Sequence, residues 1–421
     1  MTEKKEFKGK WYIPESPEIK VAGILFFFPN ETIKLELFGP LSAKDFIFQN
    51  NLHVIHGEVY TEKSDYSIIT LFDCKASSSN NFSEVFPVYY YCNSMLLGRH
   101  LFSKTDAVFN RIRVYLPHFT YWCNRIQWKL EFGDNVSINN RDEYYQKYQI
   151  NDDCCININI EASSFNGNDH FEYVLKTVAY IELENINKSN FMDLYNLMFW
   201  FKNFYSFAAM TAIPFTQVLF YDNDDFMEDE NGNPVLNSLE KKIYNPTELF
   251  HTTEVKFKEK KTHSFLFTLN DIENDFETII KNWYAKKEES KPIIGHLINS
   301  ITYKKTFESI DFLIVIQAIE GYSLRFINEK NEKLRNLLCS LCEEYNDIKL
   351  INIDETDISK AVDSRNYYSH FFKSGKKKNV CKGLALFELT KKLKILLMCC
   401  VFSLIGFDNK EINRLLSHYN M

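Results

Sequence analysis

Hydrophobic and polar residues follow two different periods along the chain, and the change falls near residue 270. Before it, short apolar or alternating runs are separated by clusters of Ser, Asn and Asp, a pattern typical of many short strands. Such a series predicts a β-sandwich or a curled sheet. The expected strands are Ile19 to Phe28, Ile33 to Phe38, Asn51 to Tyr60, Tyr66 to Phe72, Val85 to Tyr91, Arg111 to Leu116, Ile156 to Glu161, Val218 to Tyr221, Glu254 to Phe257 and Ser264 to Leu269.

One segment in this first part has a helical period instead. Between Phe191 and Ile213, apolar residues such as Leu194, Met198 and Phe201 recur three and four positions apart. This spacing predicts one long helix, and we expect it to lie against the sheet.

Beyond residue 270 the helical period continues almost to the end of the chain. Five or six helices in this length indicate a bundle. The fold class is therefore α+β, with a β-rich domain over residues 1–270 and an all-α bundle over residues 271–421. The expected helices are Ile272 to Lys286, Ile293 to Tyr303, Ser309 to Phe326, Glu329 to Tyr345, Asp357 to Phe371 and Gly383 to Phe407.

The last of these helices is apolar on nearly every side. Leu393, Leu397 and Leu404 belong to this continuous apolar surface. Such a helix is central in its own domain or forms an interface with another subunit, and we expect the interface to include Leu397 or Leu404.

The best candidate for chemistry is the segment Asp363 to His370. Ile358, Ala361 and Val362 follow the spacing of a buried helix face, and the next residues on that stripe are Arg365, Asn366 and Ser369. A charged arginine on an inward face is unfavourable unless it is paired or lines a wet cleft. We therefore expect a cleft at this position.

Two further observations bear on this cleft. At about 100° per residue, Arg365 and His370 lie about 140° apart around one helix, so a single helix presents the pair poorly. The helix around Asp311 to Phe326 carries Gln317 and Glu320 on its apolar stripe, which gives a second inward polar position. The alternative to a catalytic cleft is a buried Glu–Arg pair that braces the bundle.

A run of lysines follows directly after His370. Such a run is commonly a solvated loop, but its position beside the candidate site favours contact with phosphate groups. The candidate contacts are Lys373, Lys376, Lys377 and Lys378.

Other histidine, cysteine and acidic groups do not predict a metal or redox site. In a strand, residues three apart face opposite sides, so the two imidazoles of His53 and His56 do not converge. The paired cysteines lack a second pair at ligand spacing, and the acidic loop lacks the residue order of a calcium loop. The groups considered are His53 and His56, Cys154 and Cys155, Cys339 and Cys342, and the loop from Asp222 to Pro234.

Charge and composition narrow the class of protein. With 421 residues, 45% hydrophobic and 16% aromatic, the chain can form two or three domains with sizeable cores. A net charge of −7 argues against broad non-specific binding of nucleic acid, so RNA contact requires a local basic patch. The start of the chain lacks an apolar signal region and the cysteines lie in apolar runs, which predicts a cytoplasmic protein. The longest apolar run, Ile395 to Ile405, is too short to span a membrane.

The motif Arg365-Asn366-x-x-x-His370 resembles the Arg-x4-His motif of HEPN ribonucleases, which are all-helical domains of defence and toxin systems. The opening of the chain, with Gly9-Lys10-Trp11 and Pro14-Glu15 before an expected hairpin, resembles the N-terminal domain of ApeA-like anti-phage proteins. Those proteins end in a HEPN domain, so the two resemblances together span almost the whole chain.

The resemblance implies a metal-independent endoribonuclease of an abortive-infection type anti-phage system. RNA carries its own nucleophile, the 2′-OH, and no cofactor is required. His370 would then transfer protons and Arg365 would stabilise the charged phosphorane, while Asn366 and Glu320 would orient the site. The implied partners are RNA, such as tRNA or another structured RNA, a second copy of the chain bound through the helical half, and a phage-derived trigger at the N-terminal domain.

Two other functions remain open from the sequence. One is a non-catalytic HEPN module that binds RNA or nucleotide through the same Arg and His. The other is a β-sandwich receptor for a ligand, with a helical half that only dimerises.

Overall fold

The computed structural model describes residues 4–29, 31–41, 51–60, 66–77, 88–125, 128–132, 136–140, 144–166, 173–236, 240–251, 265–302, 309–327, 333–370 and 379–417. The strands are β1 (Lys5–Tyr12), β2 (Val21–Phe27), β3 (Ile33–Leu37), β4 (Leu52–Tyr60), β5 (Tyr66–Ser77), β6 (Val88–Cys92), β7 (Ser94–Leu97), β8 (Val108–Tyr115), β9 (Trp128–Phe132), β10 (Val136–Asn140), β11 (Tyr144–Gln149), β12 (Cys154–Asn166), β13 (Tyr173–Asn190), β14 (Gln217–Tyr221) and β15 (Thr247–His251).

The helices include α2, which belongs to the β-rich half, and a series that follows the last strand. They are α1 (Phe119–Cys123), α2 (Phe191–Ala208), α3 (Leu269–Ile272), α4 (Phe276–Ala285), α5 (Lys287–Thr302), α6 (Ser309–Tyr322), the π-helical turn η2 (Ser323–Ile327), α7 (Leu334–Glu344), α8 (Glu355–His370), α9 (Gly383–Ile405) and α10 (Asn409–Leu416).

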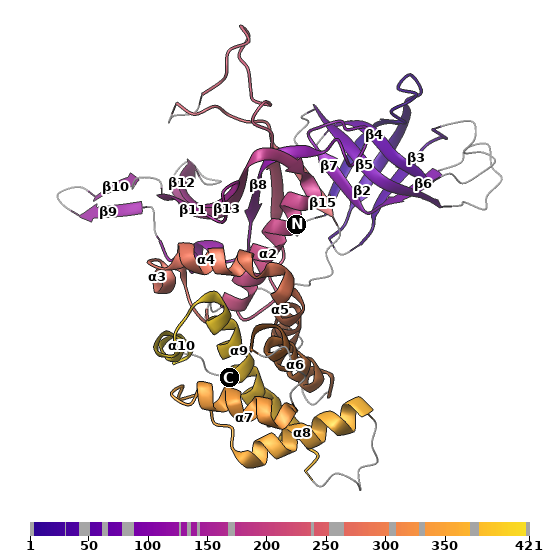
Figure 1. The fold of residues 1–421 in the computed structure, drawn as a ribbon. Helices are drawn as coiled ribbons and strands as arrows, with labels where there is room; N and C mark the ends of the chain where they lie inside the picture. Colours follow the sequence, from indigo (N-terminus) through magenta and orange to yellow (C-terminus); the bar gives the residue numbers. More distant parts are fainter. Residues whose placement is uncertain are drawn as a thin grey trace.

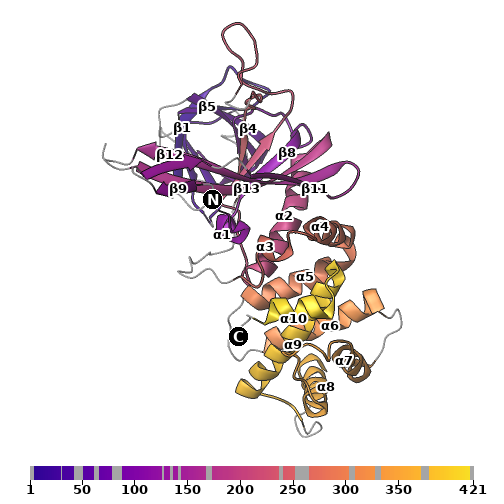
Figure 2. The same cartoon turned by 90° about the vertical axis from the view of Figure 1, so that its left-hand side faces the viewer.

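Thirteen strands form one curled antiparallel sheet in the order β11-β12-β13-β8-β14-β15-β7-β5-β4-β1-β2-β3-β6, while β9 and β10 pair separately. An additional pairing of β5 with β6 closes six of these strands into a cylinder. In Figures 1 and 2 the strands lie at one end of the molecule and helices α5 to α10 at the other, with α2, α3 and α4 between them. The expected β-rich region followed by helices is confirmed.

The cylinder is filled by the inward residues of alternating strands. In β3, Ile33, Leu35 and Leu37 are buried and the residues between them are not, as a two-residue period requires. Trp11 of β1 lies across Gly57 of β4, where an added Cβ would come within 2.3 Å of the indole. The glycine at this position therefore admits the ring that closes the centre of the cylinder.

The second part of the sheet packs on α2. Ile112 and Val114 of β8 are buried on the same side as Phe201 and Phe204 of α2. The helix begins at a cap in which Asn190 Oδ1 accepts a hydrogen bond from the N–H of Met192 at 3.0 Å. The long helix expected from Phe191 is confirmed, although it ends at Ala208.

The β-rich half and the helical half share one core. Trp200 of α2 and Trp283 of α4 stack at 4.8 Å between ring centroids, and each indole N–H donates to the backbone carbonyl of the other residue, at 2.9 and 3.0 Å. We call this arrangement the tryptophan clasp. The domain boundary near residue 270 stays a prediction, since buried residues form one continuous cluster across it.

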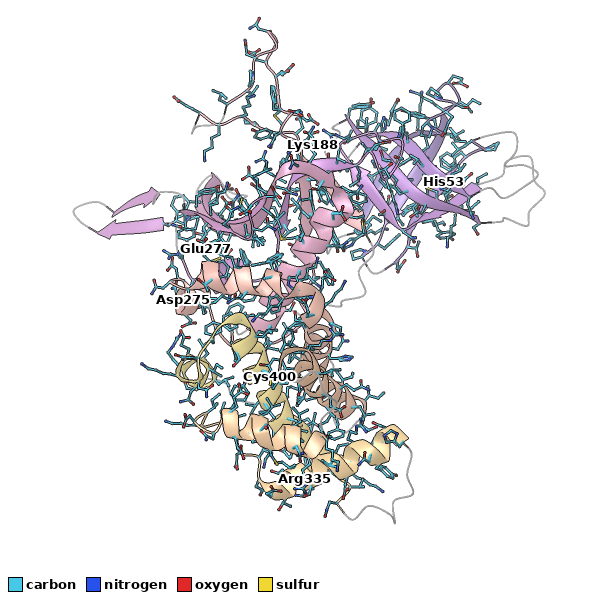
Figure 3. The ribbon with its side chains drawn as sticks, viewed as in Figure 1. His53, Lys188, Asp275, Glu277, Arg335 and Cys400 are labelled. Atoms are coloured by element: carbon cyan, nitrogen blue, oxygen red, sulfur yellow. The ribbon has the colours of Figure 1, made fainter. Side chains whose placement is uncertain are left out.

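Helix α9 is central to the helical half. Leu393, Leu397 and Leu404 are buried within the single chain, where α9 contacts α4, α5, α6 and α10. Figure 3 shows Cys400 of the same helix among the surrounding helices. The expectation that α9 offers its apolar face to another subunit is therefore wrong, because neighbouring helices of the same chain already cover it.

Some local expectations differ from the structure. The strand expected over Ser264 to Leu269 is wrong because α3 begins at Leu269, and the strand Glu254 to Phe257 lies outside the described residues. His53 is exposed and His56 buried, with His56 Nε2 2.9 Å from the Leu101 carbonyl oxygen. In the described part of the chain, no helix is long and apolar enough to cross a membrane.

Candidate active site

Helix α8 carries the Arg-Asn-x-x-x-His sequence at its C-terminal end. Its first turn is capped by Asp354, whose Oδ1 accepts a hydrogen bond from the N–H of Asp357 at 2.8 Å. Ile358, Ala361 and Ser364 form the buried side of the helix. Packing of this side fixes the rotation of α8 and thereby the direction of the site residues.

The side chains of Arg365 and His370 meet directly. Arg365 Nη1 lies 3.0 Å from His370 Nε2, although the two residues are five positions apart on one helix. The expectation that one helix presents this pair poorly is wrong, because the long arginine side chain spans the angular difference. A guanidinium has only donors, so the imidazole nitrogen is the acceptor in this contact.

Glu320 of α6 holds the other end of the guanidinium. Its Oε1 lies 3.2 Å from Arg365 Nη2, and the two side chains are 30% and 29% exposed. Asn366 Oδ1 is 3.4 Å from Arg365 Nη1, a long hydrogen bond. Four of the expected site residues, from two helices, thus form one connected group at the surface.

Exposure distinguishes this group from a buried brace. A pair with about a third of each side chain in water contributes at most about 1 kcal/mol to stability. The Glu320–Arg365 contact therefore has little value as a structural brace, and the guanidinium can exchange its partners for a ligand at low cost.

Two residues assigned to the same inward surface do not belong to it. Ser369 and Gln317 are exposed. The buried side of α6 consists of residues such as Phe312, Val315 and Ile319, which lie at a different angle from the expected stripe. The angle is set by the helices that α6 contacts, and the sequence of α6 alone does not specify it.

The expected lysine contacts Lys373, Lys376, Lys377 and Lys378 lie outside the described residues. The chain on either side of them is held beside α8. On one side is His370, the last residue of the helix, and on the other the N–H of Asn379 donates to Asp363 Oδ2 at 3.3 Å.

Cys381 then anchors the returning chain to α8. Its N–H donates to Ser364 Oγ at 2.9 Å, and its carbonyl oxygen accepts from the Tyr368 hydroxyl at 3.0 Å. These contacts fix the chain that follows residue 378 next to the candidate site.

Tyr367 and Lys382 adjoin the site and were not recognised from the sequence. The Lys382 ammonium lies 5.4 Å from the centroid of the Tyr367 ring. Lys382 is exposed and Tyr367 half-buried. The available signal was an aromatic residue within the motif and a lysine after the basic run, but their proximity depends on the path of the chain between them.

The described residues contain no group of three or more His, Cys, Asp or Glu side chains placed to hold a metal ion. The cysteines noted in the sequence are free thiols, buried at Cys154 and Cys155 and half-buried at Cys339 and Cys342. Burial raises the pKa of the Cys342 thiol to about 11, with smaller contributions from Cys339 and Glu343, so the thiol is protonated at neutral pH.

Comparisons with known families agree with both ends of the chain. The model of ApeA N-terminal domain 1 matches residues 6–283, and the model of the Apea-like HEPN domain matches residues 313–411. Searches of curated proteins and of solved structures find no match. The second matched region contains Glu320, Arg365, Asn366 and His370. The chain therefore belongs to the ApeA family, with the family's N-terminal domain followed by an ApeA-like HEPN domain.

Proposed function

We propose that this protein is an endoribonuclease of an abortive-infection type anti-phage system, and that it cleaves RNA without a metal ion. The observation that carries the proposal is the contact of Arg365 with both His370 and Glu320 at an exposed helix end. Membership of a family with a HEPN domain supports it, because RNA is the typical substrate of such domains.

The proposed reaction uses the 2′-OH of RNA as nucleophile. His370 accepts the proton of this hydroxyl as its oxygen attacks the neighbouring phosphorus atom. The bond from phosphorus to the 5′ oxygen breaks, and the leaving oxygen takes a proton from the imidazolium so formed or from water. Arg365 donates hydrogen bonds to the phosphate oxygens, on which negative charge develops. The products are a 2′,3′-cyclic phosphate and a 5′-hydroxyl.

The contacts of Arg365 bear on how proton transfer would begin. The guanidinium donates to His370 Nε2, so the lone pair needed for proton transfer is engaged. A phosphate group that attracts Arg365 would release this lone pair beside the substrate. Glu320 and Asn366 would then hold the guanidinium in the range from which it reaches the phosphate, as positioning residues.

Contacts to RNA beyond the scissile phosphate would come from the basic residues around α8. Lys373, Lys376, Lys377 and Lys378 are proposed to bind phosphate groups, and the anchoring of the chain on either side of them supports this assignment. Tyr367, with Lys382 near its ring, offers a surface on which a base can stack.

The test is cleavage of total cellular RNA by the purified full-length chain. Arg365→Ala and His370→Ala should each lower the cleavage rate by about 10²- to 10⁴-fold with an unchanged circular dichroism spectrum. Wild-type activity should persist in EDTA, and sequenced products should carry 2′,3′-cyclic phosphate ends.

Arg335→Ala is the matched control. Arg335 is exposed and paired with a carboxylate, Glu355 at 2.6 Å, but it lies on α7 and contacts the first half of α8, before the motif. Wild-type cleavage by a well-folded Arg365→Ala or His370→Ala variant would show that the catalytic assignment is wrong.

We further propose that the active unit is a homodimer or higher homo-oligomer formed through the helical half, as the HEPN resemblance implies. Exposure of His370 and Ser369 at the end of α8 is compatible with a partner helix beside the site. The apolar face of α9 gives no support, because it is already covered.

Mixing inactive Arg365→Ala chains with inactive His370→Ala chains tests this arrangement. If Arg365 of one subunit acts with His370 of the other, each mixed dimer should regain one of its two sites, which is about a quarter of all sites in a random equal mixture, and analytical ultracentrifugation should show oligomers. A monomeric protein that cleaves RNA would exclude the oligomer.

A further inference from the structure

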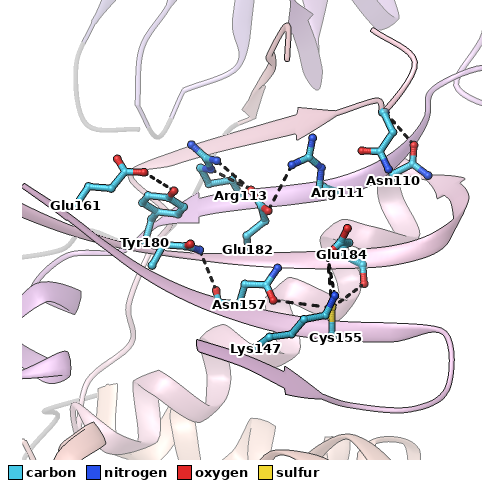
Figure 4. A network of polar contacts seen from close by, with 12 residues as sticks. Asn110, Arg111, Arg113, Lys147, Cys155, Asn157, Glu161, Tyr180, Glu182 and Glu184 are labelled. Carbon is cyan, nitrogen blue, oxygen red and sulfur yellow. Dashed lines mark hydrogen bonds and ion pairs between the residues drawn. The ribbon is translucent and has the colours of Figure 1, made fainter. Parts of the chain in front are cut away.

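A second arginine cluster lies on the sheet of the N-terminal half, on the face opposite α2. Along β8, Ile112 and Val114 point into the core shared with α2, so Arg111, Arg113 and Tyr115 alternate with them on the other face. Figure 4 shows Arg111 and Arg113 side by side above the neighbouring strands. This face therefore places two guanidinium groups on β8, between β13 and β14.

One carboxylate serves both arginines, but unequally. Glu182 of β13 is directly opposite Arg113 in the antiparallel pairing of β13 with β8. Its Oε2 lies 3.1 Å from both Nε and Nη2 of Arg113, which makes a two-pronged contact. Arg111 reaches the same carboxylate only with Nη1, at 3.7 Å, beyond normal hydrogen-bond distance. Glu182 therefore neutralises Arg113 and leaves Arg111 largely uncompensated.

The other nearby carboxylates have cations of their own. In the turn after β14, Asp222 contacts Arg99 at 3.3 Å and Lys188 at 2.7 Å. Asp225 pairs with Arg99 at 2.5 Å, and Asp224 with Lys188 at 2.7 Å. Among the described residues, these three carboxylates share two cations, Arg99 and Lys188, and none of the three contacts Arg111.

Aromatic rings hold the Arg111 guanidinium in place. Its Cζ lies 4.1 Å from the Tyr244 ring centroid and 5.4 Å from that of Tyr221. Contacts with ring faces leave the edges of the planar guanidinium for hydrogen bonding. Burial raises the pKa of Tyr221 to about 12, so its phenol is neutral and adds no negative charge.

One edge of Arg111 has no acceptor in the described part of the chain. Both Nε and Nη2 are buried without a hydrogen-bond partner. These two nitrogens point in the same direction from the guanidinium, so together they form the fork that binds two oxygens of one carboxylate or phosphate. A buried, charged fork without an acceptor is unfavourable, and an oxyanion would satisfy both donors together.

We propose that Arg111, held between Tyr221 and Tyr244, binds the phosphate or carboxylate group of a small ligand on this face of the sheet. The site is separate from the HEPN motif and does not depend on the proposed nuclease activity. Glu182 and Arg113 act as its positioning residues, because their contact occupies the acceptor that Arg111 would otherwise share.

The experiment measures thermal unfolding of the full-length chain in chloride, phosphate or acetate at equal ionic strength. Phosphate, acetate or both should raise the midpoint of the wild type by more than that of Arg111→Gln. Comparison with the variant in the same buffer removes the general stabilising effect of phosphate. In calorimetric titration with the more effective ion, Arg111→Gln should bind about tenfold more weakly or worse, the loss expected for a charge-assisted hydrogen bond.

Lys176→Gln is the matched control. Lys176 is exposed on the same face of β13 as Glu182, six residues away from it, so its removal should leave ion binding unchanged. Preference for phosphate over acetate, or the reverse, identifies the group that the ligand carries. No stabilisation over chloride by either ion, or equal stabilisation of Arg111→Gln, would overturn the proposal.

A second measurement uses the wild type alone, in case Arg111→Gln fails to fold. Phenylglyoxal modifies arginine side chains, and mass spectrometry reports the extent at each position. The effective ion should protect Arg111 and should not protect Arg335, which is exposed on α7. Equal modification of Arg111 with and without the ion would contradict the site.

Discussion

The Arg–Glu contacts in the two halves of the molecule have almost the same length but different surroundings. Arg113 and Glu182 on the sheet are 3.1 Å apart, and Arg365 and Glu320 in the helical half are 3.2 Å apart. Glu182 is 8% exposed, whereas Glu320 is 30% exposed. Contact distance alone therefore says little about how much either pair stabilises the fold. The exposure of the two side chains to water determines that contribution.

The surroundings also determine how far each arginine can move. On the sheet, Arg113 lies 4.2 Å from the ring of Tyr180 and 5.0 Å from that of Tyr221, inside a layer of strands. At the end of α8, Arg365 is held by hydrogen bonds at a partly solvated surface. The first arrangement suits a fixed binding site, and the second suits a site whose contacts change during a reaction.

The largest expected difference is in stability. Replacing Glu182 with Gln leaves Arg113 without its paired carboxylate and removes the weaker contact of Arg111 at 3.7 Å, which should lower the free energy of unfolding by about 3–5 kcal/mol. Glu320→Gln should lower it by less than about 1 kcal/mol, because its pair is partly hydrated. Urea unfolding of both variants measures the two values.

In an RNA cleavage assay, the order of the two effects should be reversed. Glu320→Gln should slow cleavage through misplacement of Arg365, while folded Glu182→Gln should cleave at the wild-type rate. Equal losses of stability in the two variants would mean that exposure does not separate these contacts.

A smaller effect is expected from salt. Replacing Lys376, Lys377 and Lys378 with Ser should raise KM more than it lowers kcat. The logarithmic slope of RNA binding against salt should fall by about 0.7 for each phosphate group that the variant no longer neutralises. Lys410→Ser on α10 is the control, since Lys410 is exposed in the same half but distant in sequence from the motif.

Salt should have little effect on the contact between Arg113 and Glu182, because buried pairs are screened weakly. Titrations of RNA binding at several chloride concentrations give the slopes of the wild type and of the triple lysine variant. If the slope for the triple lysine variant equals that of the wild type, Lys376, Lys377 and Lys378 do not bind phosphate.

The spacing of hydrophobic residues predicted well those elements whose structure depends mainly on residues close in sequence. The hairpin β2–β3 and helices α6, α8 and α9 were expected close to their observed positions. Strand β1 and helix α10 were not identified. The pairing of β8 with both β13 and β14 was not predictable either, because strand order depends on contacts between distant segments.

The candidate site shows the same limit. The motif and the patterns of two helices predicted from the sequence that Glu320, Arg365 and His370 lie close together. The predicted rotation of α6 and α8 about their own axes was wrong, and it placed Gln317 and Ser369 on the inward side although both are exposed. This rotation is set by the helices that pack against them. The Arg111 cluster was missed entirely, since Glu182 lies opposite Arg113 only after β13 pairs with β8.

The tryptophan clasp has a consequence for how such proteins can be recombined. Each indole depends on a carbonyl supplied by the other half, so a cut near residue 270 would separate Trp200 from Trp283 and strip both of their acceptors. An exchange of N-terminal domains between relatives would therefore succeed only if the crossover lies beyond Trp283, where the incoming segment carries its own matching indole. The exchangeable N-terminal module would then include α4, and the HEPN module would begin after it.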